Sequence, residues 1–203
     1  MTPGKRALDL LAGGVGLVVG VPVFLVVAAA VKLDDGGPVF FRQERVGRHG
    51  RRFRIWKFRS MAADAERTGR PLTVGDDPRV TRVGRWLRAW KLDELPQLLN
   101  VVRGEMSLVG PRPEVPRYVE LYTLEQSRVL DLTPGITDPA SIRYRNEAEA
   151  LERADDPEAA YIDTLMPEKI RLNLEYGDVA TVWSDLRVIL RTLGAVIHVV
   201  KPG

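Results

Sequence analysis

A long uncharged segment near the N-terminus constrains this chain more than any other feature of its sequence. Leu10 to Val31 contains no charged residue; Lys5, Arg6 and Asp9 precede it and Lys32 follows it. A straight helix of this length reaches about 33 Å, enough to cross the hydrocarbon core of a bilayer. A cleaved signal peptide fits poorly, because its apolar region has only about 7–15 residues. The segment therefore predicts a helix that enters a membrane.

Two topologies remain open for this helix. A simple anchor would span the bilayer, whereas a re-entrant helix would enter and leave on the same face. Pro22 lies near the middle and lacks a backbone N–H, so it predicts a break or kink there. Cations flank both ends, and their preference for the cytoplasmic side is met best if neither end crosses. These observations favour the re-entrant helix, although kinked spanning helices also contain proline.

The segment that follows is basic and predicts a β-hairpin. Residues 38–46 and 52–59 have strand-like composition, and Gly47 to Gly50 supplies a turn between them. The alternation slips at Trp56, which predicts a bulge. Eight Lys/Arg lie in residues 42–59 with aromatic residues among them. Such a surface suits phospholipid headgroups, diphosphates or nucleic acid, and a solvated strand has the same composition.

Composition bounds the architecture. The chain has 203 residues, enough for one domain with a real core, and it has no cysteine, which excludes disulfides and zinc–thiolate sites. Residues 1–60 hold eleven Lys/Arg against four Asp/Glu, which points to anionic partners. Helical periodicities after the hairpin predict an α+β, mainly helical fold: a re-entrant membrane helix over residues 1–33, and a cytosol-facing domain over residues 34–203 that forms one structural unit with it.

Asp93 and Glu94 are adjacent carboxylates between two predicted helices, residues 83–90 and 95–102. One interpretation is structural, because Asp93 is well placed to cap the second helix and Glu94 to favour its dipole. The other is chemical. Cations such as Arg88 lie close by, and a carboxylate beside cations stays ionised, as a nucleophile or metal ligand requires. Mg²⁺ prefers one or two carboxylates together with substrate phosphate oxygens, so the pair suggests phosphate chemistry at a metal.

A proline-stiffened loop follows the acidic pair. Pro111 and Pro113 flank Arg112, whose guanidinium suits phosphate because its fork donates two hydrogen bonds. Alone, this motif also fits a surface arginine in a rigid turn. The C-terminal stripe from Val182 to Val200 fits either a core helix or one lying in the headgroup region.

These segments together resemble the bacterial sugar transferases known as monotopic phosphoglycosyl transferases, in order and spacing and over nearly the whole chain. The matching pieces are the apolar segment with Pro22 and the runs at residues 38–43, 53–61, 92–101, 106–113 and 133–137. Two departures stand out. Asp138-Pro139-Ala140-Ser141 replaces a Gly-Trp-Ala-Gln type run, and Asn173 stands where many relatives place an aspartate.

The resemblance implies a reaction. A nucleoside-diphosphate sugar, usually a UDP-sugar, gives its phosphosugar to a polyprenol phosphate such as undecaprenyl phosphate, and UMP is released. It also implies Mg²⁺ at Asp93 and Glu94, with Asp93 as the nucleophile of a covalent aspartyl-phosphosugar and Glu94 as its partner. Further residues are implied at the nucleotide or phosphates: Arg112 with Pro111 and Pro113, then Arg88, Lys57, Arg59 and Arg145.

The same resemblance implies a monotopic protein of the bacterial inner (cytoplasmic) membrane that starts assembly of a glycoconjugate, with its active site on the cytoplasmic face and no nucleic-acid partner. Amphipathic interfacial helices would surround that site, and Pro22 would break the membrane helix. The sequence leaves the sugar and the oligomeric state open, a homodimer included. Two rival hypotheses remain: a non-enzymatic membrane-tethered module that binds anionic polymer or lipid through residues 42–59, and a spanning anchor with an unrelated soluble domain.

Overall fold

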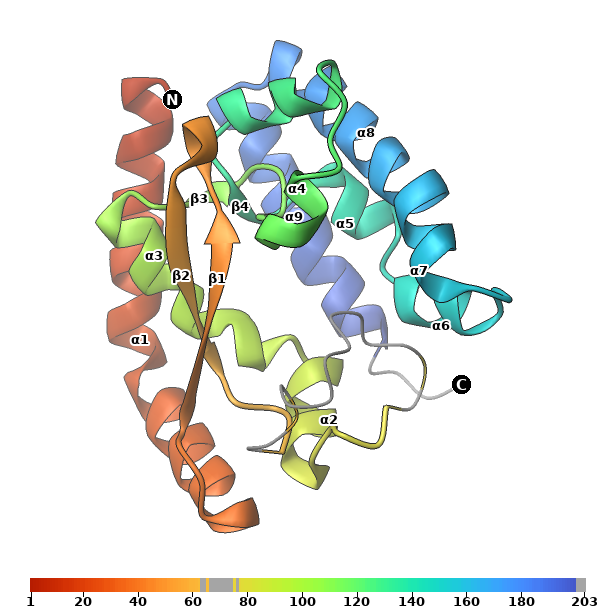
Figure 1. Ribbon diagram of the computed structural model, residues 1–203. Helices are drawn as coiled ribbons and strands as arrows, with labels where there is room; N and C mark the ends of the chain where they lie inside the picture. The colour runs from red at the N-terminus through yellow and green to blue at the C-terminus, as the bar shows by residue number, and fades with distance from the viewer. Residues whose placement is uncertain (63–64, 66–74, 76, 200–203) are drawn as a thin grey trace.

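The computed structural model describes residues 1–62, 65, 75 and 77–199. The described chain is mainly helical, with one antiparallel strand pair and one short parallel pair (Figure 1). From the N-terminus its elements are α1 Pro3–Asp35, β1 Phe40–Val46, η1 Arg48–Gly50, β2 Arg52–Phe58, α2 Arg82–Ala89, η3 Leu92–Gln97, α3 Leu98–Arg103 and β3 Ser107–Val109. They continue with α4 Pro116–Val119, η4 Gln126–Asp131, β4 Gly135–Thr137, α5 Pro139–Arg143, α6 Glu147–Glu152, α7 Pro157–Ala160, η5 Tyr161–Leu165, α8 Met166–Val179 and α9 Val182–Val199.

The predicted membrane helix is α1, a single helix of 33 residues. Thr2 caps its N-terminus, and Gly36 ends it with a left-handed φ of 73°, a conformation that glycine adopts without strain. The helix runs without interruption through Pro22, so proline does not end it there. Among the described residues, α1 is the helix long and apolar enough to cross a membrane. The re-entrant topology stays a prediction.

Both ends of α1 are fastened to the rest of the molecule by polar side chains. Near the N-terminus, Lys5 donates to Asp185 at 2.6 Å, and buried Asp9 accepts from the backbone N–H of Leu108 at 2.9 Å. Near the C-terminus, Asp34 accepts from the backbone N–H of Val83 at 3.2 Å. The helix therefore does not project from the molecule as a free anchor.

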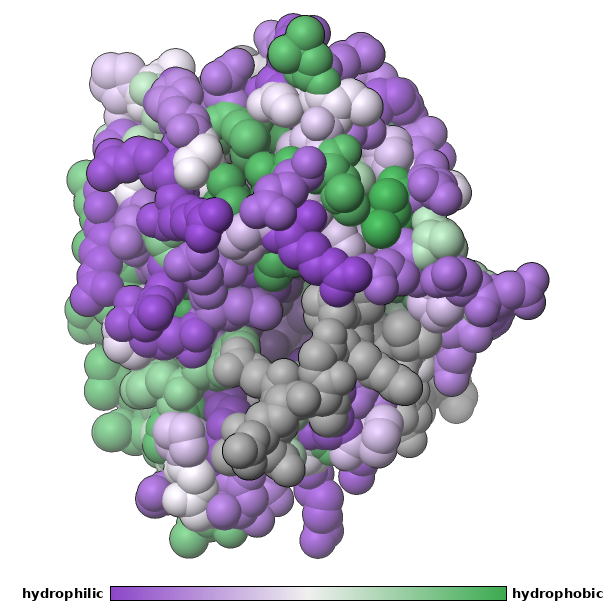
Figure 2. Space-filling view, viewed as in Figure 1, coloured by the Kyte–Doolittle hydropathy of each residue, from purple (hydrophilic) through white to green (hydrophobic). Residues whose placement is uncertain are grey.

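Between these ends, one side of α1 packs against the rest of the protein and the other side is exposed. Val27 and Val31 are buried against Phe58 and Leu87. The outward residues remain exposed although they are apolar: Leu10, Leu11, Val15, Val18, Val19, Leu25 and Val26. In Figure 2 hydrophobic side chains gather along the edge formed by α1, whereas hydrophilic ones cover the hairpin. An apolar surface this extensive marks a site of contact with lipid or protein.

The predicted hairpin is confirmed. Strands β1 and β2 pair antiparallel from Phe40↔Phe58 to Val46↔Arg52 without a break, so the bulge predicted at Trp56 is wrong. Trp56 lies beneath the guanidinium of its cross-strand partner Arg42, 4.3 Å from the ring centroid. That cation–π contact explains an aromatic side chain at a position where the alternation calls for a polar one.

A second strand pair supports the proline-flanked loop. Strands β3 and β4 pair parallel, and the backbone N–H of Gly135 donates to the carbonyl of Pro111 at 2.9 Å. A Cβ on Gly135 would overlap the backbone of Gly110, so the two chains approach as closely as glycine allows. This contact fixes the loop that carries Arg112.

The C-terminal part forms a separate apolar cluster beside the hairpin. Its buried centre consists of Tyr118, Val129, Leu151, Tyr161, Met166 and Ile170. The acidic segment 147–163 is partly internal, because Leu151 and Tyr161 within it are core residues.

Candidate active site

The acidic pair lies in a short 3₁₀ helix between α2 and α3. Lys91 precedes it with a left-handed φ of 54°, a rare conformation for a residue with a Cβ and one that concentrates at functional sites. Asp93 and Glu94 are both buried in the first turn of η3. Asp93 is not the cap of the following helix, because the chain is already helical when it reaches that residue. Its role is therefore not explained by capping.

Glu94 is held by two cations from separate elements. Lys57 of β2 donates to its Oε1 at 2.9 Å, and Arg112 donates to both oxygens, with 3.1 Å between Nη1 and Oε2. The two-strand alternation places Lys57 and Arg45 on the same face of the hairpin, opposite the face of Trp56. The hairpin and the proline-flanked loop thus clamp one carboxylate between them.

Burial and neighbouring charges shift the pKa values of the two carboxyl groups in opposite directions. Burial raises the pKa of Asp93, and the neighbouring charge of Glu94 raises it further against the effect of Lys57 and Arg88. Burial also opposes ionisation of Glu94, but Arg112 and Lys57 outweigh it and hold the pKa of that carboxyl well below its usual range. The sequence predicted an ionised Asp93 beside cations. In the structure that description fits Glu94, because Glu94 takes the direct contacts.

Asp93 has a buried oxygen without a partner. Its Oδ1 lies out of solvent and accepts no hydrogen bond from the described part of the chain. A buried acceptor left unpaired costs about 1–3 kcal/mol, so it is kept for a reason other than stability. Candidate partners are a proton, a metal ion or a reacting phosphorus.

The other predicted residues separate into two groups. Arg88 donates from Nε to the hydroxyl of Ser60 at 2.9 Å, and the charge of nearby Asp93 raises the pKa of Arg88 against the effect of burial. Arg59, in contrast, is buried in an ion pair with Asp35 at the end of α1. The structure therefore places Arg59 at the junction with the membrane helix, with no contact to the acidic pair.

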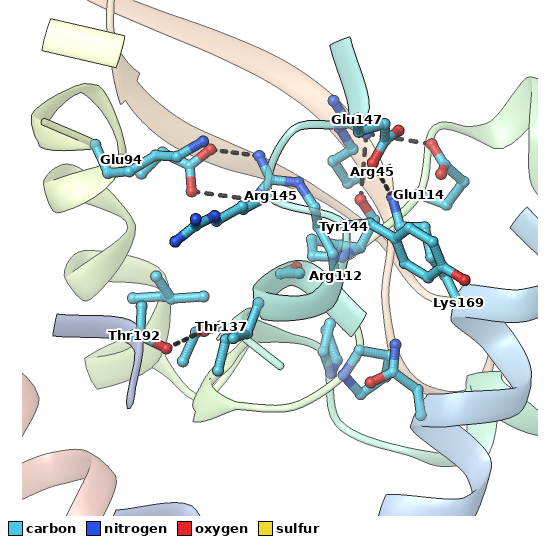
Figure 3. Close-up of a pocket in the computed structure, with 18 of the residues that line it drawn as sticks. Arg45, Glu94, Arg112, Glu114, Thr137, Tyr144, Arg145, Glu147, Lys169 and Thr192 are labelled. Atoms are coloured by element: carbon cyan, nitrogen blue, oxygen red, sulfur yellow. Dashed lines mark hydrogen bonds and ion pairs between the residues drawn. The ribbon is translucent and has the colours of Figure 1, made fainter. Parts of the chain in front are cut away.

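A cavity of about 740 Å³ adjoins the site. Its lining includes six predicted residues, Arg88, Glu94, Pro111, Arg112, Pro113 and Arg145, whereas Asp93, Lys57 and Arg59 lie outside it. Figure 3 shows Glu94, Arg112 and Arg145 together on one side of this cavity. The volume lies within the 300–1,000 Å³ typical of ligand sites.

Polar residues that the sequence did not single out face the opposite side of the cavity in Figure 3. Arg45 pairs with Glu114 at 3.4 Å, Glu114 also accepts from the hydroxyl of Tyr161, and Lys169 pairs with Glu147 at 2.7 Å. Arg45 stood within the predicted basic stretch, yet only the hairpin register shows that it points inward. Nothing in the sequence places Glu147 or Lys169, because both come from distant helices.

Mg²⁺ fits the acidic pair only together with a substrate. The described residues contain no cluster of three or more His, Cys, Asp or Glu side chains that would enclose a metal. Asp93 offers an unpaired buried oxygen and Glu94 a second carboxylate. Two carboxylates completed by phosphate oxygens are a usual magnesium environment.

Comparison with known proteins identifies the family. The model of the bacterial sugar transferase family matches residues 2–199, and the chain belongs to that family. It is 38% identical over 197 residues to the UDP-glucose:undecaprenyl-phosphate glucose-1-phosphate transferase of Caulobacter vibrioides, which covers 95% of this chain and 69% of that protein. It is 43% identical over 159 residues to the uncharacterized sugar transferase EpsL of Bacillus subtilis, which covers 78% of this chain and 77% of that protein.

One of the relatives is much longer than this chain. The galactosyl transferase CpsE of Streptococcus agalactiae is 38% identical over 205 residues, which are 95% of this chain but 42% of CpsE. The chain thus spans less than half the length of that relative. The predicted resemblance to bacterial sugar transferases is confirmed.

Proposed function

We propose that this chain transfers a sugar 1-phosphate from a UDP-sugar to a polyprenol phosphate, such as undecaprenyl phosphate, and releases UMP. The observation that carries the proposal is the unpaired carboxylate of Asp93 beside a Glu94 clamped by Lys57 and Arg112. This arrangement stands at the wall of a cavity of ligand size. The names of the relatives supply the substrate classes.

Catalysis proceeds by two displacements at phosphorus. The Asp93 carboxylate attacks the sugar-bearing phosphorus, the bond from that phosphorus to the bridging oxygen breaks, and UMP leaves with the electron pair. An oxygen of the polyprenol phosphate then attacks the aspartyl-phosphosugar and frees Asp93. Covalent capture divides a transfer between a water-soluble and a lipid-bound reactant into two steps.

The residues around the pair prepare that attack. The attack requires the ionised form of Asp93: burial raises the pKa of this carboxyl, and the nearby cations Lys57 and Arg88 favour its ionised form. Arg112, Lys57, Arg88 and Arg145 supply cations that offset charge on the phosphoryl oxygens. Asp93 and Glu94 would hold Mg²⁺, which would supply further neutralisation of charge on the phosphoryl oxygens.

Membrane attachment through α1 is part of the proposal. A helix of 33 residues is about 50 Å long, yet polar contacts fasten it to the same body at both ends. A helix crossing the bilayer upright would carry one of those ends to the other side. The contacts therefore support a re-entrant α1 on the cytoplasmic face of the inner membrane, with the first membrane step of glycan assembly as its role.

The rival hypothesis of a polymer-binding basic stretch has less support. Arg45, Lys57 and Arg59 all make internal ion pairs and are not displayed on the surface. A non-enzymatic binder has no use for the buried acidic pair.

Detergent-solubilised protein incubated with UDP-sugars, polyprenol phosphate and Mg²⁺ tests the reaction through UMP release. Asp93→Asn abolishes release, whereas Asp131→Asn, at an exposed acid, leaves it unchanged. An Asp93→Asn variant as fast as wild type contradicts the nucleophile assignment.

Topology has its own test, which the absence of native cysteine simplifies. Thr2→Cys and Ala150→Cys are treated in intact cells with an impermeant thiol reagent. The re-entrant helix predicts that both remain unlabelled until the cells are opened. Labelling at position 2 alone rejects it.

A further inference from the structure

Part of the cavity wall is apolar. Leu95 and Leu98 follow Glu94 along η3 and into α3, and all three line the same cavity. From the other side α9 contributes Ile189, Leu193 and Val196, spaced to share one helix face. We call these five apolar residues the α3–α9 corridor.

The corridor borders the lipid-facing part of the molecule. Leu98 packs against α1, since a Cβ added at Gly16 would lie 3.0 Å from its Cδ1. Leu193 lines the cavity and is nevertheless 56% exposed, so the cavity opens to the surface along α9. Leu190 of the same helix is exposed as well, next to the exposed Arg191.

We propose that the α3–α9 corridor binds the first isoprene units of the polyprenol phosphate acceptor, with its phosphate held at Arg112 and Arg145. A phosphate head on a methyl-branched apolar chain matches a cavity whose wall carries both cations and a row of aliphatic side chains. The sugar and nucleoside of the donor carry many hydroxyl groups, and the corridor residues offer no side-chain hydrogen-bond partners. This proposal rests on the proposed transferase function and adds the place where the lipid substrate lies.

Photolabelling tests the corridor without requiring turnover. The full chain in detergent micelles is irradiated with farnesyl phosphate that carries a diazirine on its third isoprene unit. The expected label lies on peptides containing residues 95–98 and 189–196, and unlabelled undecaprenyl phosphate competes it away. Label confined to the outer face of α1, or equal labelling by the diazirine analogue of farnesol without phosphate, overturns the proposal.

Kinetics provide a second test with a matched pair of variants. Leu193→Gln alters the corridor, whereas Leu190→Gln changes an equally apolar and 68% exposed leucine of the same helix that does not line the cavity. Loss of one leucine contact with an isoprene unit raises the KM for farnesyl phosphate about tenfold in Leu193→Gln only. Leu190→Gln keeps both the wild-type KM and the wild-type rate of UMP release in the absence of acceptor.

The transferase proposal and the corridor proposal can fail separately, because UMP release from the donor and binding of the acceptor are measured separately. If the wild type releases no UMP from any UDP-sugar, the transferase proposal fails, and photolabelling still decides whether the corridor binds a polyprenyl phosphate. If UMP release is normal but Leu193→Gln and Leu190→Gln have the same KM for farnesyl phosphate, the corridor proposal alone fails.

Discussion

The ion pair between Lys57 and Glu94 yields the sharpest prediction about the site. Lys57 Nζ lies 2.9 Å from Glu94 Oε1, and the two side chains are only 16% and 11% exposed. At an effective dielectric constant of 20, unit charges at this range attract by roughly 6 kcal/mol, and burial of the charges offsets part of it. We therefore expect a coupling free energy of about 2 kcal/mol between the two residues.

An exposed pair of nearly equal length serves as the control. Arg52 and Glu44 lie 3.0 Å apart on the hairpin, with side chains 60% and 44% exposed. Solvent screening reduces such a pair to about 0.2–1 kcal/mol. The two pairs thus share geometry and differ in burial.

Double-mutant cycles measure both couplings. Unfolding in detergent is followed for Lys57→Met, Glu94→Gln and the double variant, and for Arg52→Met, Glu44→Gln and their double variant. For a chain of this size a coupling of 2 kcal/mol corresponds to about 4–8 °C in Tm. High salt weakens the Arg52–Glu44 coupling and leaves the Lys57–Glu94 coupling nearly unchanged. Equal couplings for the two pairs would refute the electrostatic account of the site.

Three further predictions concern neighbouring features. Asp93→Asn raises stability at neutral pH by about 1 kcal/mol, because it removes a buried unpaired charge. Since the pKa of Asp93 is raised in the folded state, that gain vanishes as the pH falls below the ordinary aspartate pKa of about 3.8, which unfolding at pH 7 and pH 3 checks. Lys5→Met leaves the hydroxyl of Tyr176 as the one side-chain donor to the buried carboxylate of Asp185 among the described residues. The loss costs about 2–3 kcal/mol, read by thermal unfolding against Lys32→Met at an exposed lysine. Gly135→Ala forces the backbone of Gly110 aside and costs about 1–3 kcal/mol, and wild-type stability there would contradict the close packing.

Local sequence patterns predicted the elements whose cause is local. The alternation in residues 38–59 gave the hairpin, and the uncharged run from Leu10 gave α1. The bulge at Trp56 was wrong because a cross-strand contact with Arg42 set that position. The presence of a bulge depends on the strand register and on the residue across the strand pair, and the sequence of one strand reveals neither.

The site was predictable as a set of residues but not as an arrangement. Asp93 and Glu94 are adjacent in sequence, yet only the fold gives Glu94 both cations and leaves Asp93 with an unpaired oxygen. Arg59 shares the basic stretch with Lys57 and nevertheless pairs with Asp35. Long-range contacts of this kind assign the roles, because burial and pairing depend on segments far apart in the chain.

Chemical trapping of the intermediate tests the central claim most directly. The protein is mixed with Mg²⁺ and a UDP-sugar labelled in the sugar, without acceptor, then quenched and digested for peptide mapping. The account predicts one equivalent of UMP per active site and the label on the peptide that contains Asp93, which polyprenol phosphate then discharges. Turnover that proceeds at full rate with no label on that peptide would contradict it.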